Sequence, residues 1–369
     1  MSRINDEFKP DWLHLVPPGE SILESMDMLG LSQKALAQRT EYTTKHIHKL
    51  LKGEAPINSD TALRLEKVLN MPAYLWLNLE STYREALAQK AETEALNAEA
   101  DWLKKIPLND MKKWQWVESF TNKGEQVKEC LKFYGVSSVT AWNKEQKSYQ
   151  VAFKAYENFS MDEVAIQTWL RVGEINARNI NCQPFDKQKL KQSLPALREL
   201  TLLDNPDDFL PKLQALCANC GVAVVFAPTP KKCPMSGATK WLTSNKALLL
   251  LSLRHKTNDH LWFAFFHEIG HILKHKKQLF LEEASKKSFK NNKELEDEAD
   301  NFASELLISK QYNIELGTLT GLAAIKEFAK KIGIAPGIVV GRLQHQRKLD
   351  WKHGNKLKVK YDWERPQSK

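Results

Sequence analysis

The sequence contains few cysteines, and their arrangement excludes a disulfide framework. Five cysteines are scattered over 369 residues, at positions 130, 182, 217, 220 and 233. An odd, unevenly spaced set does not match the paired pattern of small secreted domains. Only one Cys-x-x-Cys pair is present, Cys217 and Cys220, and a four-cysteine zinc site would need a second. We therefore expect Cys217 to pack in a core and Cys220 to close a helix.

The sequence also lacks long hydrophobic runs. The longest apolar stretches, 261–266 and 247–251, are far shorter than the roughly 20 residues that span a bilayer. The first residues do not resemble a signal peptide, and no internal repeat or low-complexity segment is present. These absences predict a soluble, cytoplasmic protein without a membrane partner.

Positive charge is in excess but unevenly distributed. The formal net charge is +9, yet residues 1–108 hold 13 basic against 16 acidic side chains. Residues 342–369 hold 9 basic against 3 acidic side chains. Net charge is therefore weak support for nucleic-acid binding. We interpret residues 346–369 as a solvated basic tail that adds nonspecific attraction to phosphates or acidic partners.

The most informative stretch is His-Glu-Ile-Gly-His at 267–271, which lies in an apolar segment. Two histidines four residues apart share one helix face, so His267 and His271 can bind one zinc ion. Glu268 can take a proton from a water that the metal activates. On a straight helix His275 lies about 12 Å along the axis from His267, too far to share the ion. We expect His275 to be a polar residue near the helix end.

A third protein ligand is expected from the amphipathic helix predicted over 294–307. A catalytic zinc site takes three protein ligands and leaves one position for water. Glu298 and Phe302 are four residues apart, which places Glu298 on the core side of this helix. We therefore predict Glu298 as the third ligand, with Glu294 and Asp297 as the alternatives, and we expect Glu294, Glu296 and Asp300 to lie on an acidic, solvated face of the helix.

These segments resemble the ImmA/IrrE family of bacterial metallopeptidase-like domains. The resemblance covers roughly residues 200–345 and rests on the stretches 237–241, 250–254, 262–271, 298–303 and 341–344. It implies that His267, His271 and Glu298 bind zinc and that Glu268 is the general base. It leaves the substrate open, because some members cleave a specific repressor and for many no proteolysis is established.

The N-terminal segment has the pattern of a helix-turn-helix module. Apolar positions at helical spacing predict four short helices, the first of which ends at Gly30. Ser32, Thr43 and Ser59 are suited to cap the second, third and fourth helices. The third helix would enter the DNA major groove. Its polar and basic side chains are positioned to contact base edges and phosphates, namely Thr44, Lys45, His48 and Lys49.

This segment resembles the Xre/Cro helix-turn-helix class. The resemblance rests on the stretches 31–37, 47–53 and 62–69, and residues 76–79 with Tyr83 are similar to the HigA-type antitoxin subgroup. It implies binding to a double-stranded DNA operator. Because one such module reads only a few bases, we expect a homodimer.

The predicted architecture is mainly α, with a small α+β zincin-like domain at the C-terminal end. We divide the chain into a four- or five-helix helix-turn-helix domain (1–82), a helical middle region (83–200), the metallopeptidase-like domain (201–345) and the tail (346–369). Aromatic residues of the middle region are expected to form a core or a dimer surface. Strands are expected at 222–226, 239–242 and 248–253, and the last is our candidate edge strand for holding substrate.

Two functions are compatible with these features. In the first, the protein is a DNA-binding transcription regulator whose zinc-dependent endopeptidase domain cleaves a protein partner, a repressor or a toxin-system component. In the second, it is a HigA-like antitoxin or repressor whose zinc domain senses or binds without proteolysis. A purely structural site would not need Glu268, which favours the first function. The second stays open because no oxyanion-stabilising residue is recognisable.

Overall fold

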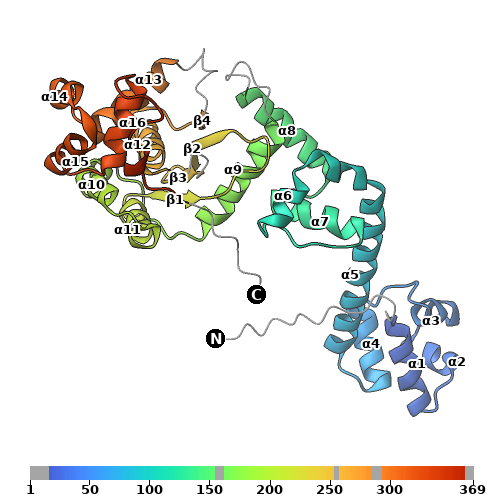
Figure 1. Cartoon of the computed structure of the whole chain (residues 1–369). Helices are drawn as coiled ribbons and strands as arrows, with labels where there is room; N and C mark the ends of the chain where they lie inside the picture. Colours follow the sequence, from blue (N-terminus) through green and yellow to red (C-terminus); the bar gives the residue numbers. More distant parts are fainter. Residues whose placement is uncertain (1–15, 154–161, 253–256, 284–292, 362–369) are drawn as a thin grey trace. The chain divides into compact units, whose positions relative to one another are not determined.

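The computed structural model describes residues 16–153, 162–252, 257–283 and 293–361 (Figure 1). Contacts divide the chain into two compact units, one of Met1–Ala100 with Thr121–Lys128 and one of Asp101–Phe120 with Glu129–Lys369. The predicted mainly α architecture with a small sheet is confirmed. The domain boundaries at 82, 200 and 345 stay predictions. Among the described helices, none combines the length and apolarity needed to cross a membrane.

The first unit is a bundle of helices with its own core. Its helices are α1 (Pro18–Met28), α2 (Gln33–Thr40), α3 (Thr44–Leu51), α4 (Ser59–Leu69) and α5 (Ala73–Ala98). The core contains Ile22, Leu36, Ile47, Leu65 and Trp76, each fully buried. Helices α1 and α3 approach closely, because a Cβ on Gly19 would lie 1.9 Å from the carbonyl oxygen of Leu51.

Side-chain caps define where these helices begin. The backbone N–H of Ala35 donates to Ser32 Oγ at 3.2 Å, and that of His46 donates to Thr43 Oγ1 at 3.1 Å. Both predicted caps are therefore confirmed. The prediction for the fourth helix was wrong by one residue, because the cap of α4 is Asn58, which accepts from the N–H of Thr61 at 2.9 Å.

The second unit begins with helices that surround an aromatic cluster. They are η2 (Ala100–Lys105), α6 (Leu108–Lys113), α7 (Lys123–Tyr134), of which the residues up to Lys128 belong to the first unit, α8 (Val139–Phe153) and α9 (Glu163–Arg178). The rings of Trp102 and Trp142 meet edge to face at 5.3 Å, and Tyr134 lies against both. All three side chains are buried, so these aromatic residues form a core.

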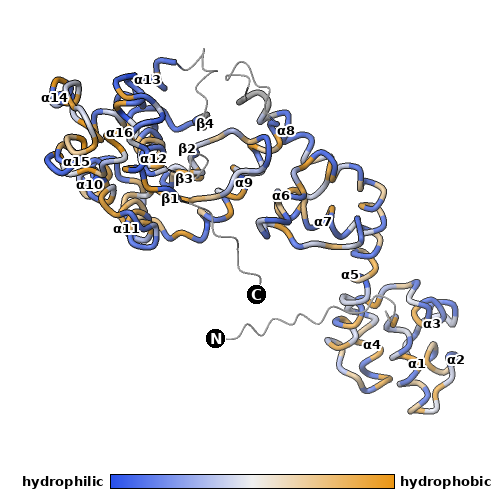
Figure 2. The backbone as a smooth tube through the Cα atoms, in the orientation of Figure 1, coloured by the Kyte–Doolittle hydropathy of each residue, from blue (hydrophilic) through white to orange (hydrophobic). Residues whose placement is uncertain are grey.

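A four-stranded mixed sheet lies at the centre of this unit. Its strands are β1 (Val222–Phe226), β2 (Met235–Thr243), β3 (Lys246–Leu251) and β4 (Phe280–Glu283), in the order β1-β3-β2-β4. β3 runs parallel to β1 and antiparallel to β2, which is also antiparallel to β4. β1 is coloured as a hydrophobic strand in Figure 2, as expected for a strand covered by helices.

Helices cover both faces of β3. Leu248 and Leu250 face α9, where a Cβ on Gly173 would lie 2.7 Å from Leu250 Cδ2. Leu249 belongs to the core formed with α12 (Asn258–Lys274). Because β3 pairs with strands on both sides, the prediction of a substrate-holding edge strand at 248–253 was wrong. Within the described residues, β4 pairs only with β2 and is an edge strand beside α12.

The remaining helices complete the core around α12. They are α10 (Lys187–Glu199), η3 (Leu200–Leu202), α11 (Pro206–Ala218), α13 (Lys293–Leu307), η4 (Lys310–Tyr312), α14 (Asn313–Thr318), α15 (Gly321–Ile332) and α16 (Pro336–His345). α12 packs against α13 and α16 on one side and against β2 and β3 on the other.

The segment after α16 is only partly a solvated tail. Its basic side chains Arg347, Lys348, Lys352, Lys356 and Lys360 are exposed, as predicted, but its end at 358–361 packs against the domain. After the short helix η5 (Asn355–Leu357), Thr257 and Lys360 form an isolated β-bridge. Tyr361 is 3 % exposed and packs its ring against Phe209. Lys358 Nζ forms an ion pair with Asp259 Oδ2 at 2.6 Å, with both side chains 7 % exposed. Residues 362–369 lie outside the described residues.

The buried ion pair predicts a specific loss of stability. We expect Lys358→Met to lower the free energy of unfolding of the second unit by about 3–5 kcal/mol, because it leaves the buried Asp259 carboxylate without its partner. Denaturant unfolding followed by circular dichroism measures this loss. Lys356→Met, at an exposed position of the same segment, is the matched control. Equal stability of the two variants would contradict a packed C-terminal segment.

Candidate metal centre

Helix α12 presents two histidines and a glutamate in a buried position. His267 is 1 % exposed, His271 2 % and Glu268 is fully buried. The opposite wall of the site is α13, which crosses α12 closely at Gly270. A Cβ on Gly270 would lie 3.2 Å from Ala299 Cα and 3.2 Å from Phe302 Cδ1, so α12 has no room for a side chain at this position.

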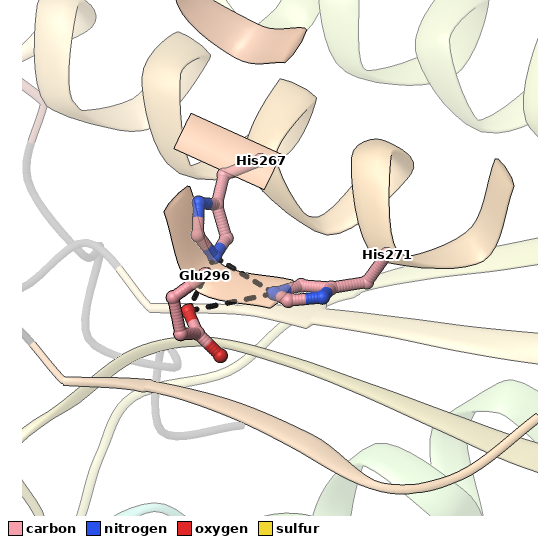
Figure 3. A group of neighbouring side chains, drawn as sticks. All are labelled: His267, His271 and Glu296. Atoms are coloured by element: carbon pink, nitrogen blue, oxygen red, sulfur yellow. Dashed lines mark hydrogen bonds and ion pairs between the residues drawn. The ribbon is translucent and has the colours of Figure 1, made fainter. Parts of the chain in front are cut away.

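Three side chains converge on one point (Figure 3). The Nε2 atoms of His267 and His271 lie 2.9 Å apart. Glu296 Oε2 lies 3.1 Å from His267 Nε2 and 3.6 Å from His271 Nε2. The ligand atoms of all three residues are within 4.8 Å of one another. Two imidazole nitrogens and a carboxylate oxygen are the donor set of a His2Glu zinc site.

The third donor is Glu296, and the structure places Glu298 elsewhere. The buried face of α13 carries Glu296, Ala299 and Ala303, at i, i+3 and i+7. The sequence argument used Phe302 to mark the inner face, but Phe302 is only half-buried. The side chain of Glu298 is 57 % exposed and its Oε2 lies 3.2 Å from His275 Nε2. The alternatives Glu294 and Asp297 are also exposed.

The other ring nitrogen of each histidine has a hydrogen-bond partner. His267 Nδ1 lies 2.9 Å from Asp300 Oδ1, and His271 Nδ1 lies 2.9 Å from His275 Nδ1. If each Nδ1 carries the proton, the lone pair of each Nε2 is free to bind a metal. The stacked ring of Phe280, 4.1 Å from that of His271, also holds the second histidine in place.

Glu268 is held beside the three donors by β2. Thr239 Oγ1 donates to Glu268 Oε2 at 2.6 Å, whereas Glu268 Oε1 is buried without a hydrogen-bond partner. Gly237 provides the room, because a Cβ there would lie 2.5 Å from Glu268 Oε1. Burial raises the pKa of Glu268 well above its ordinary value. The arrangement leaves one carboxylate oxygen available to accept a proton.

The electrostatics of the site fit a bound cation. Burial lowers the pKa of His271 to about 4, so its imidazole is neutral. Burial also opposes charge on His267, but Glu282, Asp300 and Glu296 raise its pKa well above the ordinary value. Although burial opposes it, hydrogen bonds from the two histidines lower the pKa of Glu296 to about 2. A buried site rich in carboxylates is stabilised by a metal cation.

Sequence reasoning missed three residues of this site. Glu296 was expected to be solvated, but its spacing to Ala299 and Ala303 places it on the buried face of α13 and could have identified it. Asp300 lies one turn further along α13 and was treated as a solvated acid. Thr239 was assigned to a strand, but no sequence pattern predicts that it contacts Glu268.

The exposed face of α3 carries all four predicted DNA-contacting side chains. Thr44, Lys45, His48 and Lys49 are exposed, while the opposite face of the helix is buried. The turn before α3 is held by Arg64, whose Nη1 donates to Thr40 O at 2.9 Å and to Glu41 Oε2 at 2.8 Å. The turn therefore keeps a fixed shape between α2 and α3.

Two protein families match the chain. The IrrE N-terminal-like domain family matches residues 220–318, and the helix-turn-helix family matches residues 22–76. An uncharacterized HTH-type transcriptional regulator of Escherichia coli, YddM, is 33% identical over 73 residues, which are 20% of this chain and 78% of that protein. Virulence-associated protein I of Dichelobacter nodosus is 32% identical over 76 residues, 20% of this chain and 70% of that protein. Both resemblances inferred from the sequence are confirmed.

Solved structures similar to this chain include HigA proteins. An addiction module antidote protein of the HigA family from Coxiella burnetii is 32% identical, with a TM-score of 0.21, and the match covers 23% of this chain and 92% of that chain. The Pseudomonas aeruginosa antitoxin HigA with the higBA promoter is 27% identical, with a TM-score of 0.21, covering 22% of this chain and 88% of that chain. TM-scores this low carry no structural argument.

The converging donors predict which substitutions abolish zinc binding. We expect His267→Ala, His271→Ala and Glu296→Ala each to remove a ligand and weaken zinc binding by more than roughly 100-fold, the upper range for residues outside the ligand set. Metal analysis and chelator competition on the purified chain measure this. Glu294→Ala, an exposed acid of the same helix, is the control. Loss of zinc in Glu298→Ala with retention in Glu296→Ala would contradict the assignment.

Proposed function

Because the chain belongs to the helix-turn-helix family through residues 22–76 and carries an IrrE N-terminal-like domain, we propose that it is a DNA-binding transcription regulator with a zinc-dependent endopeptidase domain. The proposed substrate is a protein partner, a repressor or a component of a toxin system. The observation that carries the enzymatic part is the buried Glu268, which keeps one unpartnered carboxylate oxygen beside the three donors.

Each residue of the site has a role in this proposal. His267, His271 and Glu296 hold the zinc ion. When bound, the ion supplies Lewis acidity that polarises a peptide carbonyl and activates water. Glu268 takes the proton of the attacking water through its free oxygen and delivers it to the leaving amine. Thr239 holds the other oxygen and so orients the carboxylate during both transfers.

The edge strand β4 is the proposed binding place for the substrate backbone. β4 follows α12 in the chain, and its Phe280 stacks on the ring of His271. An extended peptide can add to a free strand edge through main-chain hydrogen bonds. Such pairing would align a peptide bond with the metal centre without requiring a particular side chain.

The helix-turn-helix unit is the proposed operator-binding part. The exposed face of α3 would contact bases and phosphates in the major groove through Thr44, Lys45, His48 and Lys49. A single short helix reads few bases, so we propose that the chain acts as a homodimer on an inverted repeat. The half-sites would be separated by about one helical turn of DNA.

Glu268→Gln separates catalysis from metal binding. The substitution preserves the volume of the side chain but removes its capacity to take a proton. We expect the variant to bind zinc and operator as the wild type does, while cleavage of the partner falls by roughly 100-fold or more. Incubation with the candidate partner, followed by mass spectrometry of the fragments, measures this.

His267→Ala is the comparison variant for this test. If the regulatory phenotype persists in Glu268→Gln and disappears in His267→Ala, the domain acts as a metal-dependent sensor. That result would support the function of an antitoxin or repressor without proteolysis and would contradict the endopeptidase proposal. A wild-type chain that never cleaves its partner would contradict it as well.

Removing two lysines of α3 should weaken operator binding in a salt-dependent way. We expect Lys45→Ala with Lys49→Ala to lower affinity at low salt and to reduce the slope of log K against log salt by about 0.9 for each phosphate that the variant no longer neutralises. Fluorescence anisotropy at several salt concentrations measures both. Lys67→Ala with Lys90→Ala removes the same charge from α4 and α5 and is the control. An unchanged slope in the α3 variant would exclude this face as the DNA surface.

A further inference from the structure

The side chain of His275 links Glu298 to the metal centre. α12 ends at Lys274, and His275 is its C-cap with extended backbone (φ −105°, ψ 169°). Its N–H still donates to His271 O at 3.1 Å, so the chain leaves the helix only after this residue. Its ring meets that of His271 at a centroid distance of 5.0 Å, and its side chain is 3 % exposed.

The hydrogen bonds among His271, His275 and Glu298 form a series in which each residue donates to the next. If His271 binds metal through Nε2, its proton is on Nδ1, and this N–H donates to His275 Nδ1 at 2.9 Å. The proton of His275 is then on Nε2, which donates to Glu298 Oε2 at 3.2 Å. Every ring nitrogen is satisfied with both imidazoles neutral. The remaining lone pair of the two rings is on His271 Nε2, which lies 2.9 Å from His267 Nε2 and 3.6 Å from Glu296 Oε2.

His267 is also oriented by a carboxylate of α13, but through a single hydrogen bond. Its Nδ1 lies 2.9 Å from Asp300 Oδ1, so a carboxylate orients this ring directly. His271 has no carboxylate at its Nδ1, and His275 occupies that position instead. His267 is therefore connected to Asp300 by one hydrogen bond, and His271 is connected to Glu298 by two. Both carboxylates belong to α13.

We propose that His275 and Glu298 act in series as positioning residues for the zinc ligand His271. They fix the tautomer and the orientation of its ring and strengthen its Nε2 as a donor. The inference rests on the proposed zinc site, and it does not depend on whether the domain cleaves a partner.

The surroundings of Glu298 also include other charges. Glu298 lines a cavity of about 600 Å³ together with Lys187, Lys191 and Lys274. Among the ion pairs of the described residues, none joins Glu298 to these lysines, and its carboxylate lies against His275 instead. Because Glu298 is more exposed than Asp300, its effect on the metal should be smaller than that of a ligand.

The test measures the zinc affinity of the full chain by chelator competition. The variants are His275→Phe, Glu298→Ala and the double variant, with Glu294→Ala as the control for loss of one exposed charge from α13. His275→Phe keeps a ring against Phe280 but removes both nitrogens. We expect each single variant to weaken zinc binding about 10-fold, within the usual range for such residues. The double variant should bind no more weakly than His275→Phe alone.

The pattern of non-additivity decides the outcome. Unchanged affinity in Glu298→Ala, or a further loss when Glu298→Ala is added to His275→Phe, would overturn the proposal. Cobalt substitution gives a second readout, because the visible d–d bands should shift in the His275→Phe and Glu298→Ala proteins and stay constant in Glu294→Ala. Thermal unfolding of the metal-free proteins identifies a variant that merely folds poorly.

The proposed function can fail separately. A wild-type chain that shows this coupling but cleaves no partner would exclude the endopeptidase and leave the positioning role intact. A chain that cleaves its partner but does not show this coupling would support the endopeptidase and exclude the positioning role.

Discussion

Where α12 crosses α13, a Cβ on Gly270 would lie 3.2 Å from both Ala299 Cα and Phe302 Cδ1, so the close approach of the two helices requires glycine at this position. This contact determines the position of Glu296, one turn before Ala299. If the two helices lay further apart, the carboxylate of Glu296 would lie too far from the two histidines to share a metal ion with them. The arrangement of the three donors therefore depends on Gly270, which is not a ligand itself but has no side chain that would hold the two helices apart. Asp300 and Glu298 reach their histidines across the same crossing.

The site concentrates negative charge in a buried place, and its stability follows from that. Glu268 and Glu296 are buried beside His267, and Glu282 and Asp300 also raise the pKa of this histidine. In the absence of a cation, this negative charge is compensated by protonation of His267 and by hydrogen bonds. A metal ion would replace that compensation, so metal binding and folding of this domain are expected to be coupled. The compensation by hydrogen bonds is incomplete at Glu268 and Glu296, because Oε1 of each has no hydrogen-bond partner.

The two units have separate cores, so the exposed face of α3 and the buried donors of α12 and α13 are each held in place without the other unit. In the first unit, α3 can expose an entire polar face because Ile47, Leu50 and Leu51 bury the other. Arg64 holds the preceding turn from α4. In the second, β3 and α12 are buried on all sides, which gives the ligand histidines rigid support. In the proposed function, the exposed side chains of the first unit would be adaptable DNA contacts, and the buried side chains of the second would be fixed metal donors.

The sequence by itself determined the elements with strong local signals. Helical periodicity located α1 to α4, and the predicted caps Ser32 and Thr43 are correct for α2 and α3. The apolar run located β1, and spacing of four residues placed His267 and His271 on one face of α12. These properties depend on residues close together in the chain. Only the tertiary structure decided the third donor, since Glu296 and Glu298 both lie on α13 and differ only in which side faces α12. It also decided that β1 and β4, and not β3, are the edge strands, and that Lys358 and Val359 contact the first residues of α12. Strand order and helix contacts depend on residues distant in sequence, which no local pattern records.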